Sequence, residues 1–306
     1  MATERTSIHG QWSSRLAFIL AATGSAVGLG NIWTFPYIAG ENGGGAFVLV
    51  YLVCIGVIGI PIMMAEVMLG RRGRQSPINT MRTLAYEEKV SPHWRWLGWA
   101  GVLAGFLILS YYSVIAGWAL AYVFRAGSGL FTGLTADGVQ SIFSNLVDEP
   151  ERLLAWHTIF IVMTMIIVGR GVRSGLEKAV RLLMPALFVL LLVLVGYAWN
   201  TDAFQQGLDF LFRPDFDAID ANGVLIAMGH AFFTLSLGMG AIMVYGSYLP
   251  DNASIAKTSV TVSIMDTTVA LLAGMAIFPI VFANGLEPGA GPGLIFQTLP
   301  IAFGLM

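Results

Sequence analysis

Charged residues are scarce in this sequence: only 11% of its 306 residues are Asp, Glu, Lys or Arg, against about 25% in a soluble globular domain. With 56% hydrophobic residues and a mean hydropathy of +0.75, this scarcity excludes a soluble domain and predicts an integral membrane protein. The single cysteine, Cys54, excludes an intrachain disulfide. The four histidines (His9, His93, His157 and His230) are scattered without metal-ligand spacing, so we expect no enzyme such as an intramembrane protease.

Long apolar runs account for most of the chain. Windows of about 20 apolar residues predict seven membrane spans, near 12–39, 43–69, 93–125, 154–170, 176–199, 222–247 and 254–284. The segment 286–306 is rich in Gly and Pro, and we expect it to end in a short re-entrant or surface helix. Residues 1–11 are polar and lead into the first span without a small-residue cleavage site, which predicts a tail and no cleaved signal peptide.

Lys and Arg are distributed unevenly between the two sets of segments that connect these spans. One set contains Arg5, Arg15, Arg71, Arg72, Arg74, Arg82, Lys89, Arg95, Arg170, Arg173, Lys178, Arg181 and Lys257. The other set contains only Arg125, Arg152 and Arg213, among many acidic residues. Basic residues accumulate in cytoplasmic loops, so we expect a multi-pass protein of the plasma (inner) membrane with a cytoplasmic N-terminus. The lipid bilayer is then a partner, and nucleic acid is not.

Glycines interrupt two of the predicted spans, in 24–30 and, roughly 200 residues later, in 234–240. Unwound backbone survives in a membrane only where it lines a cavity or a site, and two matched breaks point to the binding site of a transporter. Free carbonyls and the side chain of Asn31 suit a hard cation such as Na⁺, and free N–H groups suit a carboxylate. The alternative is close helix packing through Gly24 and Gly28.

Two acidic residues lie inside predicted spans, where an ionisable group is costly unless it is paired. Asp266 has no basic residue within a helical turn, so either a bound cation is its partner or the residue is protonated and hydrogen-bonded. Glu66 lies nearer a cytoplasmic end. Thr234 and Ser236 in the second break can bind a ligand or bond back to a carbonyl one turn earlier.

Several further residues have two interpretations each. Tyr111 and Tyr112 can donate a hydroxyl to an anionic ligand or to a backbone carbonyl. His230 is either a titratable group or a hydrogen-bonded core residue. Gly175 and Pro185, at the start of the fifth span, can kink the helix or let its cytoplasmic end unwind.

Several sequence strings resemble the neurotransmitter:sodium symporter family in its bacterial amino-acid branch. They are Trp12–Arg15, Gly24–Trp33, Phe35–Tyr37, Glu41–Phe47, Phe232–Gly238 and Gly291–Leu294. The resemblance implies an all-α membrane protein, an inverted-repeat bundle of the LeuT type. Its first repeat would be 12–199 with five helices, followed by an extracellular loop 200–221 and, in 222–306, two helices of the second repeat. An inverted five-plus-five bundle needs three more helices, so we expect a chain truncated at its C-terminus. The alternative function is a fragment without transport activity of its own.

The resemblance also implies a site for sodium and an amino acid. The first sodium would bind the Ala26 carbonyl, the side chains of Asn31, Thr234 and Asp266, and the substrate carboxylate. A second sodium would bind the carbonyls of Gly24 and Val27. The substrate-binding residues implied are Ala26, Gly30, Ile108, Tyr112, Phe233, Thr234, Ser236 and Met239, with Phe233 as a lid.

Two residues of the implied site, Met239 and Asp266, predict the class of substrate and whether chloride is required. Met239 lies between two glycines, and a flexible Met with space around it favours a hydrophobic or aromatic L-amino acid. In chloride-dependent members an anion lies near the equivalents of Tyr51, His230, Thr234 and Ala270. Asp266 supplies a negative charge there permanently, which predicts chloride independence.

The chain departs from the family pattern at three positions. Thr34 replaces the arginine of the extracellular gate, His9 replaces a basic residue of the cytoplasmic gate, and His230 replaces a common Gln.

Overall fold

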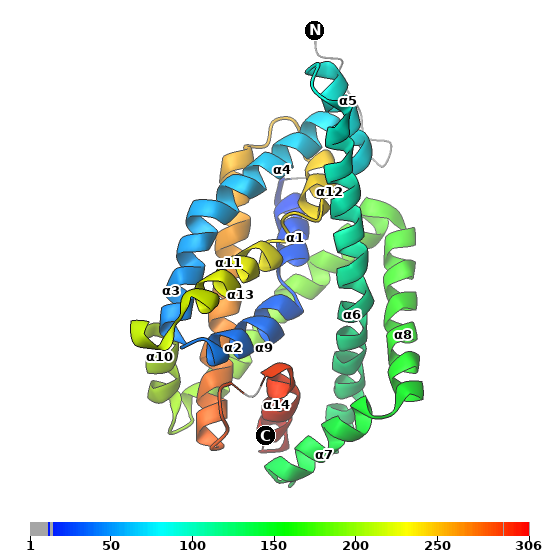
Figure 1. Cartoon of the computed structure of the whole chain (residues 1–306). Coiled ribbons are helices and arrows are strands. Elements are labelled where there is room, and N and C mark those ends of the chain that lie inside the picture. Colours follow the sequence, from blue (N-terminus) through cyan, green and yellow to red (C-terminus); the bar gives the residue numbers. More distant parts are fainter. Residues whose placement is uncertain (1–11, 13–14, 290, 306) are drawn as a thin grey trace.

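The computed structural model describes residues 12, 15–289 and 291–305, so the predicted tail 1–11 and His9 lie outside the described residues. In this part of the chain the only β-type pairing is an isolated bridge between Gly44 and Pro214. The helices, shown in Figure 1, are α1 (Arg15–Ala26), α2 (Phe35–Glu41), α3 (Gly45–Cys54), α4 (Ile60–Gly73), α5 (Pro77–Glu87), α6 (Arg95–Gly127), α7 (Ala136–Val147), α8 (Pro150–Gly169), α9 (Glu177–Trp199), α10 (Phe204–Phe212), α11 (Ala221–Thr234), α12 (Ala241–Ser247), α13 (Ile255–Ala283) and α14 (Leu294–Leu305).

Three π-helical turns join or begin these helices. They are η1 (Gly30–Thr34), η2 (Ile55–Gly59) and η4 (Val172–Leu176). The predicted span 176–199 begins with the π-turn η4, which contains Gly175, and Pro185 lies inside α9. That this end unwinds stays a prediction. Gly175 lies so close to the end of α8 that a Cβ atom there would be 2.0 Å from the Ile167 carbonyl oxygen.

Among the described residues, five helices are long and apolar enough to cross a membrane: Gly45–Gly73, Pro92–Gly127, Pro150–Gly169, Ser174–Trp199 and Ile255–Ala283. A sixth span results if Leu16–Ala26 and Gly30–Glu41, which meet at 45°, are counted as one. These six correspond to six of the predicted spans. The seventh, 222–247, consists of the short helices α11 and α12 on either side of the irregular segment 235–240.

Helix starts in the loops follow ordinary capping chemistry, since the first N–H groups of a helix need external acceptors. The side chain of Ser254 accepts a hydrogen bond from the Lys257 N–H at the start of α13. Asp220 caps α11 in the same way. Inside the spans the helix itself satisfies the backbone, as hydrocarbon requires.

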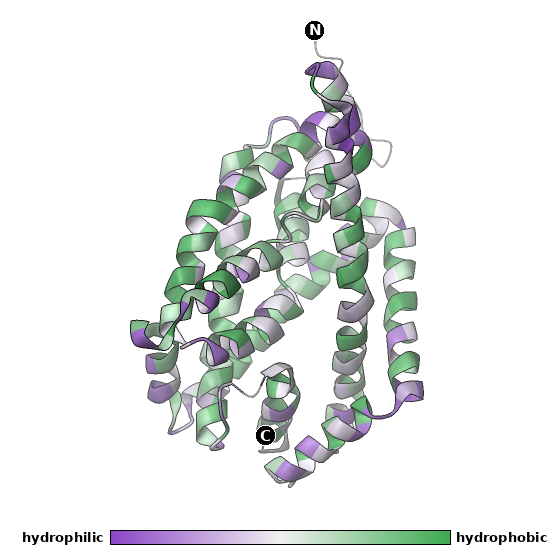
Figure 2. Ribbon diagram, in the orientation of Figure 1, coloured by the Kyte–Doolittle hydropathy of each residue, from purple (hydrophilic) through white to green (hydrophobic). Residues whose placement is uncertain are grey.

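Helix α13 is the central span of the bundle: 61% of its most apolar window is buried, whereas none of the corresponding window of α8 is buried. It packs against α1, α4, α9 and α10. Figure 2 shows hydrophilic residues gathered toward the two ends of the bundle and hydrophobic residues along the length between them. This distribution is the one expected of a bundle surrounded by lipid.

The last segment, predicted to end in a short helix, forms α14, which contacts α6, α7 and α13. Leu294 and Phe296 are buried in this packing. Figure 1 shows α14 beside α7, at the end of the bundle opposite α5. The division into a first repeat at 12–199 and the start of a second repeat at 222–306 stays a prediction.

Candidate functional site

The first break falls where the glycines predict it. Helix α1 ends at Ala26, and 27–29 separate it from η1. The Gly28 N–H donates to Oδ1 of Asn31 at 3.0 Å, and the Gly30 N–H donates to the Tyr112 hydroxyl oxygen at 3.1 Å. In a continuous α-helix these two N–H groups would bond the carbonyls four residues earlier. The break therefore releases the carbonyls of Gly24 and Ala26, two of the three predicted carbonyl ligands.

The second break, 235–240, uses backbone conformations that glycine adopts most easily. Gly238 and Gly240 have φ of 80° and 75°, and Ser236 has φ of 56°, which is uncommon for a residue with a side chain. The Ser236 hydroxyl donates to the Ser25 carbonyl at 3.1 Å, so the two breaks are directly hydrogen-bonded. The Gly238 N–H donates to Oε1 of Glu66 at 2.7 Å.

Three predicted sodium ligands meet beside the first break. Asn31, Thr234 and Asp266 come from η1, α11 and α13 and are at most 1% exposed. Nδ2 of Asn31 donates to Oδ1 of Asp266 at 2.8 Å and contacts the Thr234 hydroxyl oxygen at 3.2 Å. The Thr234 hydroxyl lies 3.1 and 3.0 Å from the two carboxylate oxygens. Among the described residues, no Lys or Arg forms an ion pair with Asp266.

The predicted carboxylate-binding groups lie next to this cluster. Tyr112 reaches the Gly30 N–H, and its ring makes an edge-to-face contact with Phe233 at a centroid distance of 6.2 Å. A Cβ atom on Gly30 would lie 3.3 Å from the Phe233 ring. Tyr111 is 46% exposed. Of the two tyrosines, Tyr112 is therefore the one that faces the break.

The remaining predicted site residues differ in how deeply they are buried. Ile108 lies half-buried on α6, one turn before Tyr112. The backbone of Met239 approaches α6, where a Cβ atom on Gly101 would be 3.0 Å from it. Gly24 faces α9, on the side of Val180 and Met184, and Val27 is 4% exposed. Among the described residues, neither Gly24 nor Val27 hydrogen-bonds to Asn31, Thr234 or Asp266.

The residues that the family resemblance places near an anion, Tyr51, His230, Thr234 and Ala270, are all buried. The His230 ring lies 5.9 Å from the Phe35 ring and 5.4 Å from the Tyr51 ring, between centroids. Within the described part of the chain, neither ring nitrogen of His230 has a hydrogen-bond partner. Ala270 is fully buried in the same hydrophobic core as Tyr51. Thr34, the residue at the extracellular gate position, is 8% exposed.

Sequence reasoning missed two contacts that shape the site. The Ser25 carbonyl binds Ser236, and Glu66 binds the backbone of the second break. An acidic residue within a span was the available signal for Glu66, but its partner is a backbone N–H 172 positions away in sequence.

Comparisons with known proteins agree with this arrangement. The sequence model described as "SNF: Sodium:neurotransmitter symporter family" matches residues 9–132 and 139–302. The uncharacterized sodium-dependent transporter YhdH of Bacillus subtilis is 40% identical over 293 residues, which are 96% of this chain and 64% of YhdH. An uncharacterized sodium-dependent transporter of Haemophilus influenzae is 37% identical over 298 residues, 95% of this chain and 65% of that protein.

A solved structure shows the same fold. The crystal structure of MhsT in complex with L-phenylalanine superposes with a TM-score of 0.91 at 47% identity, covering 97% of this chain and 67% of MhsT. The chain thus spans about two thirds of the length of the relatives it matches. The predicted all-α bundle of the LeuT type is confirmed, and the chain belongs to the sodium:neurotransmitter symporter family, a family of membrane transporters rather than enzymes.

Proposed function

We propose that this chain forms the ion- and substrate-binding part of a sodium-coupled amino-acid symporter that works by alternating access. The observation that carries the proposal is the buried cluster of Asn31, Thr234 and Asp266 beside backbone released by the first break. The Asp266 carboxylate has neutral neighbours, the Asn31 amide and the Thr234 hydroxyl, and no Lys or Arg among the described residues pairs with it. A hard monovalent cation suits such a buried acid as its charge partner.

The two sodium positions follow from this chemistry. The first sodium binds the carbonyl of Ala26 and the side chains of Asn31, Thr234 and Asp266. The second binds the carbonyls of Gly24 and Val27. Because the substrate carboxylate completes the first sodium site, ion and amino acid enter together. One charge moving down 100 mV supplies about 2.3 kcal/mol for uptake.

The substrate is a hydrophobic or aromatic L-amino acid. MhsT, which shares this fold at 47% identity, was crystallised with L-phenylalanine. In this chain the Gly30 N–H and the Tyr112 hydroxyl hold the carboxylate next to the sodium. The substrate side chain lies in a pocket lined by Ala26, Ile108, Phe233, Ser236 and Met239, and Thr234 is shared with the sodium site. The protein is placed in the plasma membrane with its N-terminus in the cytoplasm, as the basic loops predict.

Equilibrium binding of labelled amino acids to the full-length protein tests this function. We expect leucine or tryptophan, and not glycine, to bind in a sodium-dependent manner. Asp266→Ala should weaken sodium-dependent binding by more than about 100-fold, because removing one partner of a buried charge site costs roughly 3–5 kcal/mol. Thr268→Ala is the control, since Thr268 is exposed on the same helix and its hydroxyl donates to the Ile264 carbonyl one turn earlier. Unchanged sodium-stimulated binding in Asp266→Ala would remove the ion-site assignment.

Chloride independence has its own test. The Asp266 carboxylate lies within 3.1 Å of the Thr234 hydroxyl, one of the groups that the family resemblance places near the anion of chloride-dependent members. We propose that the negative charge of Asp266 takes the place of that anion. We expect sodium-driven uptake into proteoliposomes to persist when gluconate replaces chloride. Uptake that stops under gluconate and returns with chloride would contradict the proposal.

A further inference from the structure

The C-terminal end of α12, which follows the second break, receives hydrogen bonds from Trp12, which precedes α1, and from Arg74, at the end of α4. The last carbonyls of a helix have no partner within it and need outside donors. Trp12 supplies two: its indole N–H bonds the Tyr245 carbonyl at 3.3 Å, and its backbone N–H bonds the Tyr248 carbonyl at 3.2 Å. Arg74, at the end of α4, supplies two more, to the carbonyls of Ser247 at 3.0 Å and Leu249 at 2.6 Å.

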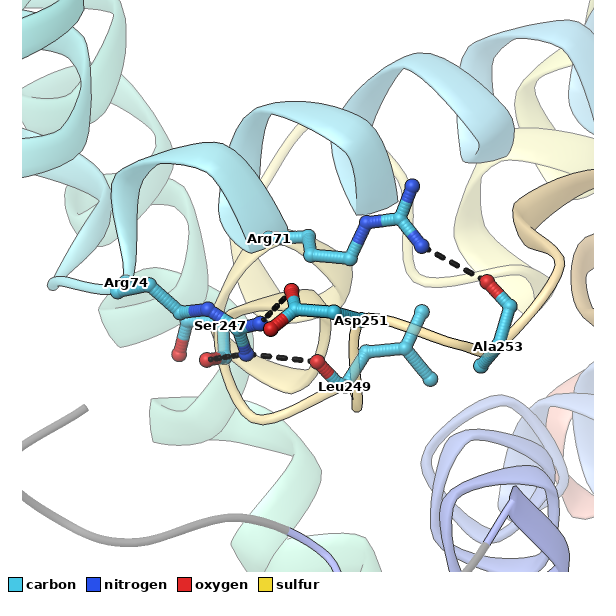
Figure 3. A network of polar contacts seen from close by, with 6 residues as sticks. All are labelled: Arg71, Arg74, Ser247, Leu249, Asp251 and Ala253. Carbon is cyan, nitrogen blue, oxygen red and sulfur yellow. Dashed lines mark hydrogen bonds and ion pairs between the residues drawn. The ribbon is translucent and has the colours of Figure 1, made fainter. Parts of the chain in front are cut away.

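Figure 3 shows how Arg74 makes these contacts. The residue ends α4 in a left-handed conformation with φ of 55°, which residues with side chains rarely adopt. Its side chain is 3% exposed, and its guanidinium also forms an ion pair with Asp251, which is 77% exposed. Arg71, one turn earlier, donates to the Ala253 carbonyl at 2.7 Å. A buried cation is tolerated only when its hydrogen bonds are made, and here the negative end of α12 provides the acceptors.

The rest of α12 is also bound to α4. A Cβ atom on Gly70 would lie 2.0 Å from the Met243 carbonyl oxygen, and one on Gly246 would lie 2.7 Å from the Val67 carbonyl oxygen. The two backbones are therefore in direct contact. Beyond the other end of α12, Glu66 of α4 binds the Gly238 N–H. Helix α4 thus holds α12 before its start, at its middle and at its end.

We propose that Arg74 is a positioning residue for the substrate site. By fixing the end of α12 on α4, it holds the segment 235–240, and with it Ser236 and Met239, in the conformation that binds the amino acid. The two carbonyl bonds are the essential part of this anchor, and the ion pair with exposed Asp251 adds little, because solvent screens it. The proposal rests on the proposed function for its substrate, but the anchor itself can be tested separately.

The test compares four variants of the full-length protein. Arg74→Gln removes the charge and most of the donors, Arg74→Lys keeps a charged donor, and Asp251→Asn removes only the ion pair. Arg72→Gln is the matched control, because Arg72 lies two residues away on α4 with its side chain 51% exposed. Two quantities are measured: the dissociation constant of L-phenylalanine in saturating Na⁺, and the hydrogen–deuterium exchange of 241–253.

Arg74→Gln should raise the dissociation constant about tenfold, because it removes hydrogen bonds made by a charged donor. Amide exchange in 241–253 should rise by a similar factor of about ten. Arg74→Lys keeps a charged donor, so its dissociation constant and its amide exchange in 241–253 should stay within about threefold of the parent protein. If Arg74→Gln fails to fold, Arg74→Lys is the variant compared with the parent protein. Asp251→Asn and Arg72→Gln should leave both unchanged.

Two results would contradict the proposal that Arg74 anchors α12 on α4. One is a lower melting temperature in Arg74→Gln with an unchanged dissociation constant and unchanged exchange in 241–253, which would leave Arg74 a purely structural role. The other is an effect of Asp251→Asn as large as that of Arg74→Gln. If the parent protein shows no sodium-dependent phenylalanine binding, the proposed substrate is wrong, and the exchange comparison still decides whether Arg74 anchors α12.

Discussion

Tyr112 and Tyr111 are neighbours with opposite environments, and their difference gives a direct test of the carboxylate site. Tyr112→Phe removes the hydroxyl that meets the Gly30 N–H. We expect this variant to bind phenylalanine about 10–100-fold more weakly at saturating Na⁺, because a hydrogen bond to a charged group is worth about 1.5–3 kcal/mol. Competition with labelled leucine at equilibrium measures the change.

Tyr111→Phe is the matched control, since Tyr111 is 46% exposed and its contact with Tyr112 is an edge-to-face contact between the two rings. It should bind like the parent protein. Equal losses in the two variants would mean that the hydroxyl of Tyr112 has no special role in holding the substrate.

At the scale of single residues, the sequence identifies a residue type that is rare in its surroundings, such as an acid inside a span. It does not identify a residue whose role depends on backbone carbonyls far away in the sequence. Asp266 stands out because an unpaired acid inside a span is costly, and the structure places it against Asn31 and Thr234. Arg74 gives no such signal. It is one of many basic residues at a predicted cytoplasmic end, and its partners are carbonyls more than 170 positions away.

The contact between α4 and α12 belongs to the scale of elements. Gly70→Ala places a Cβ atom in the space occupied by the Met243 carbonyl, so the two helices must separate. We expect the free energy of unfolding to fall by about 1–3 kcal/mol, seen as a lower melting temperature in detergent. Gly196→Ala on α9 is the control: apart from its chain neighbours and the backbone of its own helix, no heavy atom lies within 4 Å of the added Cβ, so the variant should gain about 0.5–1 kcal/mol of stability. Equal melting temperatures in both variants would argue against close backbone packing.

Helix positions were predictable from apolar run length, and helix interruptions were predictable from glycine. Six spans match the structure, and both breaks lie within the glycine-containing segments. The π-turns were not predictable, because a π-turn differs from an α-helix in hydrogen-bond register and not in composition. The turn η4 shows the limit: Gly175 and Pro185 predicted a kink or an unwound end, and the structure has a π-turn in which Gly175 lies against the Ile167 carbonyl.

At the scale of the whole molecule, composition predicts a membrane bundle but does not say which helix is central. Helices α8 and α13 are both long and apolar, yet α13 is the buried one. The family resemblance predicted the architecture, and the match to MhsT confirms it. The distribution of Lys and Arg along the chain, rather than the composition, predicts the direction in which the chain crosses the membrane.

That direction can be tested with two conservative substitutions in the segments that precede and follow α6. Ser91 precedes this helix near Lys89 and Arg95, and Ser141 lies on α7 near Asp137 and Asp148; both serines are exposed. The span 92–127 has 36 residues and is therefore about 54 Å long, more than the roughly 30 Å hydrocarbon core. In a Cys54→Ala background, which lacks other cysteines, a membrane-impermeant maleimide applied to intact cells should label Ser141→Cys and leave Ser91→Cys unlabelled. Permeabilised cells should show labelling of both variants, which controls for reactivity. Labelling of Ser91→Cys alone in intact cells would reverse the orientation and show that the basic segments face outward.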